Sequence, residues 1–172
     1  MGYLMEQVVS ILEQEREVLD TLLFKLVETR LILEAGEMRF LSRATREVER
    51  ARSRCREIDL MRAATVAQHR TGATLRDLAS SAREPWPGIL RDHHDVLAPL
   101  VAEIEMTAHL NAEHARIGLD AIRLTPVGNP SAPESPRSGD AELTRLAAGA
   151  SLETVLGTAS RLRMPDLLDF LR

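Results

Sequence analysis

The 172-residue chain has little of the material that several classes of protein require. Cys55 is its only cysteine, which excludes an intramolecular disulfide and a four-cysteine zinc site. Aromatic residues make up 3% of the chain, too few to favour a β-sandwich or barrel. The nine glycines are scattered and form no phosphate-binding loop. No uncharged apolar run approaches about 18 residues, the length that predicts a membrane-spanning helix, so we expect no membrane insertion.

The chain also lacks a surplus of basic charge. It carries 22 Lys and Arg residues against 26 Asp and Glu residues, which gives a net charge of −4. Because phosphate binding calls for a concentrated basic excess, we expect no nucleic-acid partner. The first residues contain no basic leader ahead of an apolar run, and the sequence therefore predicts a cytoplasmic protein.

The strongest positive signal is helical periodicity. Apolar residues recur at steps of three and four over about 3–34, 38–68 and 89–124, and each range predicts a long helix. Asn111 places a polar group on the third stripe, where it can fix the register, and Pro99 predicts a kink or restart. The second range has a regular heptad seam made of Leu41, Ala44, Val48, Ala51, Cys55 and Ile58.

The connections between these ranges predict how the helices pack. Gly36 can end the first helix in the left-handed conformation, and so short a break favours antiparallel neighbours. Residues 1–36 hold seven acids and three bases, whereas residues 37–62 hold eight bases and five acids, so opposite charge favours the same pairing. In the connector that follows, Thr74 and Asp77 predict a capped short helix, and Trp86 is expected at one end of the bundle.

The chain changes character at residue 125. Residues 125–140 hold four prolines and two glycines and predict a disordered Pro/Ser/Gly linker. Residues 141–172 predict an amphipathic helical tail, with Ser151 as an N-cap and Pro165 at a first helical position. The tail either docks on a partner or folds back on the bundle. The expected fold is all-α: an elongated antiparallel bundle or coiled coil of three long helices over residues 1–124, then a flexible linker and the tail.

Catalytic and metal-binding patterns are weak. No set of acid, base and nucleophile meets the requirements of an active site, so we expect no enzyme and no cofactor. Glu105, His109 and His114 on the third helix offer a metal-binding hypothesis. The first two helices contribute no histidine to this set, so solvated histidines are the preferred interpretation.

Four stretches of the chain resemble the FlgN-type flagellar export chaperones, especially their actinobacterial branch. The resemblance covers roughly residues 3–124, and its most specific strings are LLFKL (22–26) and RATREVE (43–49). The four stretches are EREVLDTLLFKLVETRLIL (15–33), LSRATREVER (41–50), EPWPGILRDHHDVL (84–97) and EIEMTAHLNAEHARIGLDAI (103–122).

This resemblance implies a cytoplasmic, non-enzymatic chaperone of type III flagellar export. Such a protein binds the C-terminal helices of hook–filament junction proteins, prevents their premature assembly and helps to deliver them to the export apparatus. The distal part of the third helix is the implied client surface, and the tail is either client-binding or self-covering. The expected partner-binding residues are Leu110, Asn111, Ile117, Leu119, Ile122, Leu152, Leu156, Leu167, Leu168, Phe170 and Leu171.

The alternative is a structural coiled-coil adaptor or dimerisation module without a role in export. In that interpretation the seam from Leu41 to Ile58 is a self-association surface, and the chain forms a homodimer.

Overall fold

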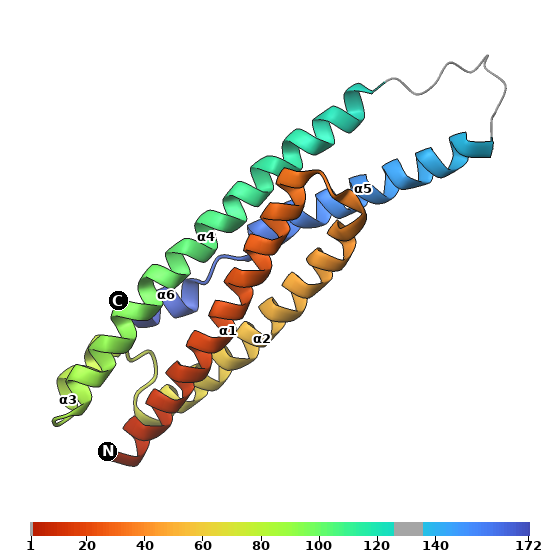
Figure 1. The fold of residues 1–172 in the computed structure, drawn as a ribbon. Helices are drawn as coiled ribbons and strands as arrows, with labels where there is room; N and C mark the ends of the chain where they lie inside the picture. The colour runs from red at the N-terminus through yellow and green to blue at the C-terminus, as the bar shows by residue number, and fades with distance from the viewer. Residues whose placement is uncertain (1, 126–135) are drawn as a thin grey trace.

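In the computed structural model, which describes residues 2–125 and 136–172, every regular element is helical (Figure 1). The long helices α1 (Gly2–Ala35), α2 (Leu41–His69), α4 (Trp86–Leu124) and α5 (Pro136–Arg161) run alternately up and down an elongated bundle. The short elements are η1 (Met38–Phe40), α3 (Leu75–Ser81) and α6 (Pro165–Leu171). The prediction of an all-helical bundle is confirmed.

The α1–α2 hairpin forms where the periodicity predicts it. Gly36 takes a φ of +69° at the end of α1, a left-handed conformation that other residues rarely adopt. The α2 seam is buried except for Cys55, which is half-buried. Across the hairpin, Lys25 Nζ donates to Glu47 Oε2 at 2.8 Å, so the opposite charges of the two helices do meet.

The connector from α2 to α4 also follows local rules. The Thr74 hydroxyl accepts from the backbone N–H of Asp77, whose carboxylate accepts from the backbone N–H of Thr74, which makes the predicted cap reciprocal. Trp86 begins α4 and packs against the core at that end of the bundle. Pro99, expected to kink or restart the third helix, lies inside a continuous α4.

The expectation of three long helices is not confirmed, because the predicted helical tail supplies a fourth long helix, α5. It begins at Pro136, inside the predicted linker of residues 125–140, and Ser151 lies within it rather than capping it. A serine lowers helix stability by less than about 1 kcal/mol, so burial of the apolar residues that follow can outweigh it. Residues 126–135 of the predicted linker lie outside the described residues.

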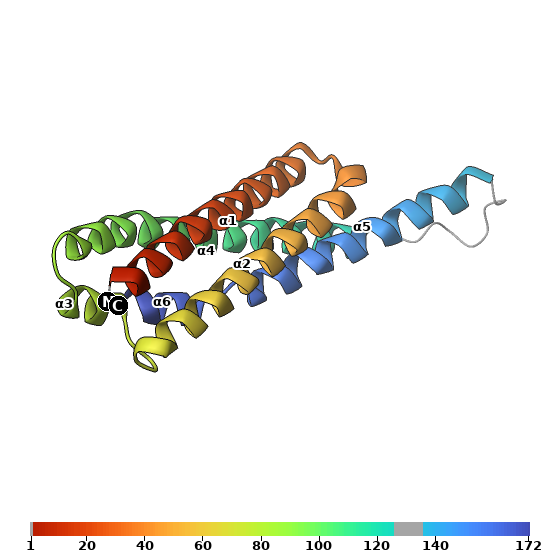
Figure 2. The ribbon, with the colours of Figure 1, turned by 90° about the horizontal axis from the view of Figure 1, so that it is seen from below.

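The tail folds back on the bundle and shares its core. Figures 1 and 2 both show α5 beside α2 and α4, with its N-terminal part extending past the α1–α2 turn. Leu162, Leu167 and Phe170 belong to the same buried cluster as Leu12 and Leu22 of α1. The predicted N1 position of Pro165 in α6 is confirmed. Within the described ranges, no helix is both long and apolar enough to cross a membrane.

Candidate helix-binding groove

The surface of α2 and α4 beneath α5 forms a lengthwise seat for a helix, which we call the α2–α4 groove. Its occupant here is the tail, whose residues Leu152, Val155 and Thr158 lie on the buried face of α5, with the buried Leu162 directly after the end of that helix. The steps of three between Leu152, Val155 and Thr158 place them on one side of a helix. The groove is lined by Leu41, Thr45, Val48 and Glu49 of α2 and by Ala108, Asn111, Ala112, Ala115, Gly118 and Leu119 of α4.

Small residues on α4 let α5 approach closely. Ala108, Ala112 and Ala115 are buried, and Gly118 follows on the same face. A Cβ atom added to Gly118 would lie 3.1 Å from Leu152 Cδ1, tighter than an ordinary van der Waals contact. Because Leu152 is only 1% exposed, it has little room to move away. The absence of a side chain at Gly118 therefore makes the space in which Leu152 of the bound helix packs.

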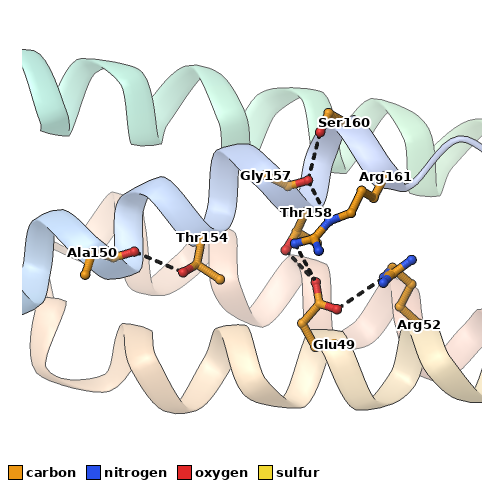
Figure 3. Close-up of polar contacts among 8 residues, drawn as sticks. All are labelled: Glu49, Arg52, Ala150, Thr154, Gly157, Thr158, Ser160 and Arg161. Carbon is orange, nitrogen blue, oxygen red and sulfur yellow. Dashed lines mark hydrogen bonds and ion pairs between the residues drawn. The ribbon is translucent and has the colours of Figure 1, made fainter.

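One acidic side chain of α2 fixes the polar edge of α5 (Figure 3). The Thr158 hydroxyl donates to Glu49 Oε1 at 2.8 Å, and Arg161 Nη2 lies 3.5 Å from the same oxygen. Arg52 of α2 donates to Glu49 Oε2 at 3.2 Å and holds the carboxylate in place. Burial works to raise the pKa of Glu49, but the Thr158 hydrogen bond and the arginine charges outweigh it and leave that pKa below its ordinary value.

A polar layer crosses the middle of the groove. Asn111 Nδ2 donates to the backbone carbonyl of Leu26 at 2.9 Å, so Asn111 ties α4 to α1 at one register, as its place on the third stripe predicts. Its Oδ1 atom is buried and has no hydrogen-bond partner. Thr29, Thr45 and Thr158 line the same small cavity, where α1, α2, α4 and α5 meet. The contact with α5 is thus less closely packed here than an apolar core would be.

A second anchor lies at the far end of the tail. Arg62 of α2 is 2% exposed and pairs with Glu15 of α1 and Asp59. The Phe170 ring of α6 covers the guanidinium, with the carbon at its centre 4.8 Å from the ring centroid. Burial raises the pKa of Glu15, against the lowering effect of Arg62, and one Glu15 oxygen is buried without a partner.

Cys55 lies beside the junction between α5 and α6. Its thiol donates to the carbonyl of Val18 at 3.4 Å, and it lines a cavity together with the connecting residues 162–164. Burial, followed by the nearby Glu15 charge, raises the pKa of the thiol to about 12. Only the thiolate is a good nucleophile, so this site disfavours thiol chemistry and agrees with the interpretation of Cys55 as a core residue.

Most of the predicted partner-binding residues face the chain itself. Asn111, Leu119, Leu152, Leu167, Phe170 and Leu171 are buried, and Leu110, Ile122, Leu156 and Leu168 are half-buried. Only Ile117, at 68% exposed, is open to solvent. The two predicted groups do converge, because the distal part of α4 packs on the tail. In this conformation a partner reaches the buried members of the set only after the tail has moved.

The sequence analysis missed the residues that hold the tail in register. Glu49 and Arg52 read as part of an ion-paired helix surface, and Thr158 and Arg161 as part of a polar helix face. A glycine inside a long helical pattern, such as Gly118, was the one available signal of close approach.

The tip of the bundle is a second exposed feature. Leu124 at the end of α4 and Leu143 and Leu146 in the first half of α5 are 82%, 66% and 62% exposed. At this end of the bundle α4 and α5 extend past the α1–α2 turn (Figure 1). Arg145 closes this tip by donating to the carbonyls of Ile122 and Thr125, which end α4. A guanidinium at this place satisfies carbonyls that a helix C-terminus leaves unpaired.

The histidines of the metal hypothesis lie apart from one another. His109 Nε2 lies 3.3 Å from Glu113, and His114 Nε2 lies 3.8 Å from Glu34 of α1. Among the residues that the structure describes, no three His, Cys, Asp or Glu side chains gather as metal ligands would.

Comparisons with known proteins do not place the chain in a family. No family model, no curated protein and no solved structure matches it.

Proposed function

We propose that this chain is an export chaperone that binds the amphipathic C-terminal helix of a hook–filament junction protein in the α2–α4 groove. It acts in the cytoplasm, performs no chemistry, and delivers the bound protein to the flagellar export apparatus. Release requires only that the helix leave the groove, so affinity in the micromolar range suits this role.

One observation carries the proposal: three of the four stretches with the FlgN-type resemblance, 15–33, 41–50 and 103–122, contribute residues to the groove or to the cavity beneath it. Lys25 of LLFKL pairs with Glu47 of RATREVE across the hairpin, and Thr45, Val48 and Glu49 of that second string line the groove. The stretch 103–122 supplies the α4 wall from Ala108 to Leu119. A groove that already seats an amphipathic helix lengthwise offers the contacts that a helical client needs.

Physics favours this use of the groove. A terminal helix of a junction protein carries apolar surface that associates with its neighbours, and burial shields that surface at roughly 25 cal/mol per Å². Small residues along α4 let the backbone of an incoming helix come close, as the seat of Leu152 at Gly118 illustrates.

The test is binding of the full-length chain to peptides that span the C-terminal helices of junction proteins, followed by calorimetry or fluorescence anisotropy. We expect one-to-one binding that is lost when the terminal helix of the junction protein is truncated. Val48→Asp in the groove should abolish binding, but it can also disturb the fold. Glu49→Gln keeps the shape of the side chain and serves as the second variant, with Glu57→Gln on the exposed side of α2 as its control. Absence of binding to every junction-protein helix would contradict the proposal.

A second candidate is the adaptor or dimerisation module, and a specific observation favours it. The seam from Leu41 to Ile58 is covered within one chain, by α1 and in part by α4 and α5, but Leu124, Leu143 and Leu146 leave an exposed apolar tip. In this candidate two tips associate and export plays no part. Analytical ultracentrifugation of the wild type against Leu143→Ser/Leu146→Ser distinguishes it, because only tip-to-tip dimers would dissociate.

A further inference from the structure

The tail helix α5 contains three glycines. Gly139, Gly149 and Gly157 all lie in it, whereas α2 contains no glycine and α1 contains only Gly2 at its start. A glycine inside a helix lowers its stability by about 1 kcal/mol relative to alanine. Contacts with α2 and α4 therefore contribute to the helical stability of α5.

The contact that holds the tail is also imperfect. The buried Oδ1 of Asn111 has no partner, and threonines line the cavity between α5 and the other helices. Another helix with the same outline could fill this space equally well. The seat is thus suited to exchange, in contrast to a close-packed apolar core.

The recognition positions on the tail form a readable pattern. Leu152 meets Gly118, Thr158 and Arg161 meet Glu49, and Phe170 covers Arg62. Along the tail, the hydroxyl of Thr158 follows Leu152 by six residues and Arg161 follows Thr158 by three. Phe170 follows Arg161 by nine residues and lies in the next helix, α6. Three positions of the bundle recognise this pattern: the carboxylate of Glu49, the buried guanidinium of Arg62, and Gly118, which has no side chain.

We infer that the tail is a removable occupant, and that the α2–α4 groove accepts amphipathic helices that present a hydroxyl and a cation to Glu49 and an aromatic ring to Arg62. This inference rests on the proposed function, because it describes the class of helix that the same groove selects. A partner helix with this pattern replaces the tail, and the tail shields the groove when no partner is present.

The test asks whether a free peptide with the tail's own sequence can replace the tail of the full-length chain. A fluorescent peptide of residues 139–172 is titrated into the full-length chain, and Thr158→Val/Arg161→Gln is introduced either into the chain or into the peptide. In the chain the change loosens the resident tail, so the groove is open more often and the peptide should bind about tenfold more tightly. In the peptide the same change removes contacts with Glu49 and should weaken binding about tenfold.

The matched control is Thr144→Val/Arg172→Gln. Thr144 donates within its own helix to the carbonyl of Asp140, and the exposed Arg172 pairs with Asp169 of α6. The control should leave the affinity unchanged in either place. Equal effects of the test substitutions in chain and peptide, or no binding of the peptide to the loosened chain, would overturn the inference.

The native thiol gives a second readout. Cys55 lies beside residues 162–164, so a loosened tail should speed its alkylation several-fold, and saturating wild-type peptide should restore the slow rate. Unchanged alkylation would overturn the inference. Sedimentation of the loosened chain should show a monomer, since a dimer would mean that the tail of a second copy fills the groove instead.

The tail-exchange experiment and the junction-protein binding experiment can fail independently of each other. Exchange of the tail peptide without capture of any junction protein would retain the groove and reject its assignment to export. Capture of a junction protein without tail exchange would place the client elsewhere, for example at the tip.

Discussion

The α1–α2 hairpin and the seat of α5 are both long helix–helix contacts, but they are built differently. Leucines of α1 such as Leu12 and Leu22 are fully buried in the hairpin, where α2 has no glycine. The seat of α5 instead combines apolar residues with a threonine–asparagine layer, a small cavity and a carboxylate near its edge. We infer from this difference that the α1–α2 hairpin fixes the fold, whereas the seat of α5 can accept another helix in place of α5.

Truncating one buried leucine to alanine in each region should give the largest difference between them. Leu22→Ala should lower the free energy of unfolding of the whole chain by about 3–5 kcal/mol, because a cavity opens in the shared core of the bundle. Leu152→Ala, also at a fully buried site, should release chiefly α5 and α6. Hydrogen exchange should show loss of protection throughout the chain in the first variant and only in the tail in the second. Equal loss of protection in α1 would contradict the distinction.

Arg62→Met tests the anchor that joins the two regions. Without Arg62, burial raises the pKa of Glu15 further, since the group that opposes the rise is gone. A carboxyl whose pKa is higher in the folded state holds its proton more tightly there, so stability falls as pH rises above the ordinary value of 4.5. We expect a loss of about 3 kcal/mol at pH 7 and a smaller loss at pH 4.5, measured by urea unfolding. A loss that does not vary with pH would show that Glu15 is not involved.

A pair of glycine substitutions separates helix propensity from close packing. A Cβ atom at Gly149 meets nothing within 4 Å, so Gly149→Ala should stabilise the docked tail by about 0.5–1 kcal/mol. The same change at Gly118 crowds Leu152 and should weaken docking despite the better helix propensity of alanine. The readout is hydrogen exchange in α5. Stabilisation by both variants would show that α4 and α5 are less closely packed than described.

Lys25→Met sharpens the hairpin side of the comparison with a small effect. Hydrogen bonds from Lys25 and then Arg43 lower the pKa of Glu47 to about 2. Without Lys25 the pKa should rise part of the way towards 4.5, as an NMR titration of the Glu47 side chain would show. The wild-type pair contributes its stability above pH 4.5 and loses it as pH falls towards 2, and its half-buried position, still reached by solvent, keeps that contribution small. An unchanged titration would contradict the pairing.

The two regions also differ in how far the sequence predicts them. The heptad seam from Leu41 to Ile58 and the turn at Gly36 are local patterns, and together they predict the hairpin. The docking of α5 depends on pairs such as Glu49 and Thr158, which are 109 residues apart, and local periodicity does not say which distant faces meet. The wrong N-cap at Ser151 has a related cause, because residue preference is a weak guide where packing stabilises a helix.

The candidate site shows the same division. The apolar residues of the tail and of distal α4 were identified as interaction surfaces, and the structure brings these two sets together. The sequence left open whether the tail folds back on the bundle or docks on a partner, since a stripe of leucines looks the same whether its partner is the same chain or another. The selective elements, Glu49 and Gly118, are single residues without periodicity. A glycine inside a helical pattern indicates a close approach at Gly118 without naming its partner, and no pattern marks Glu49.

The Arg145 clamp at the tip has a consequence for competition between the tail and a partner. Residue 145 remains joined to α4 through a short stretch of chain and grips its last carbonyls, so the released tail stays near its seat. Tethering of this kind corresponds to a local concentration on the order of millimolar, which free helices rarely reach in a cell. An incoming helix must therefore bind more strongly than the native segment does, and weakly matching helices are turned away without any dedicated gate.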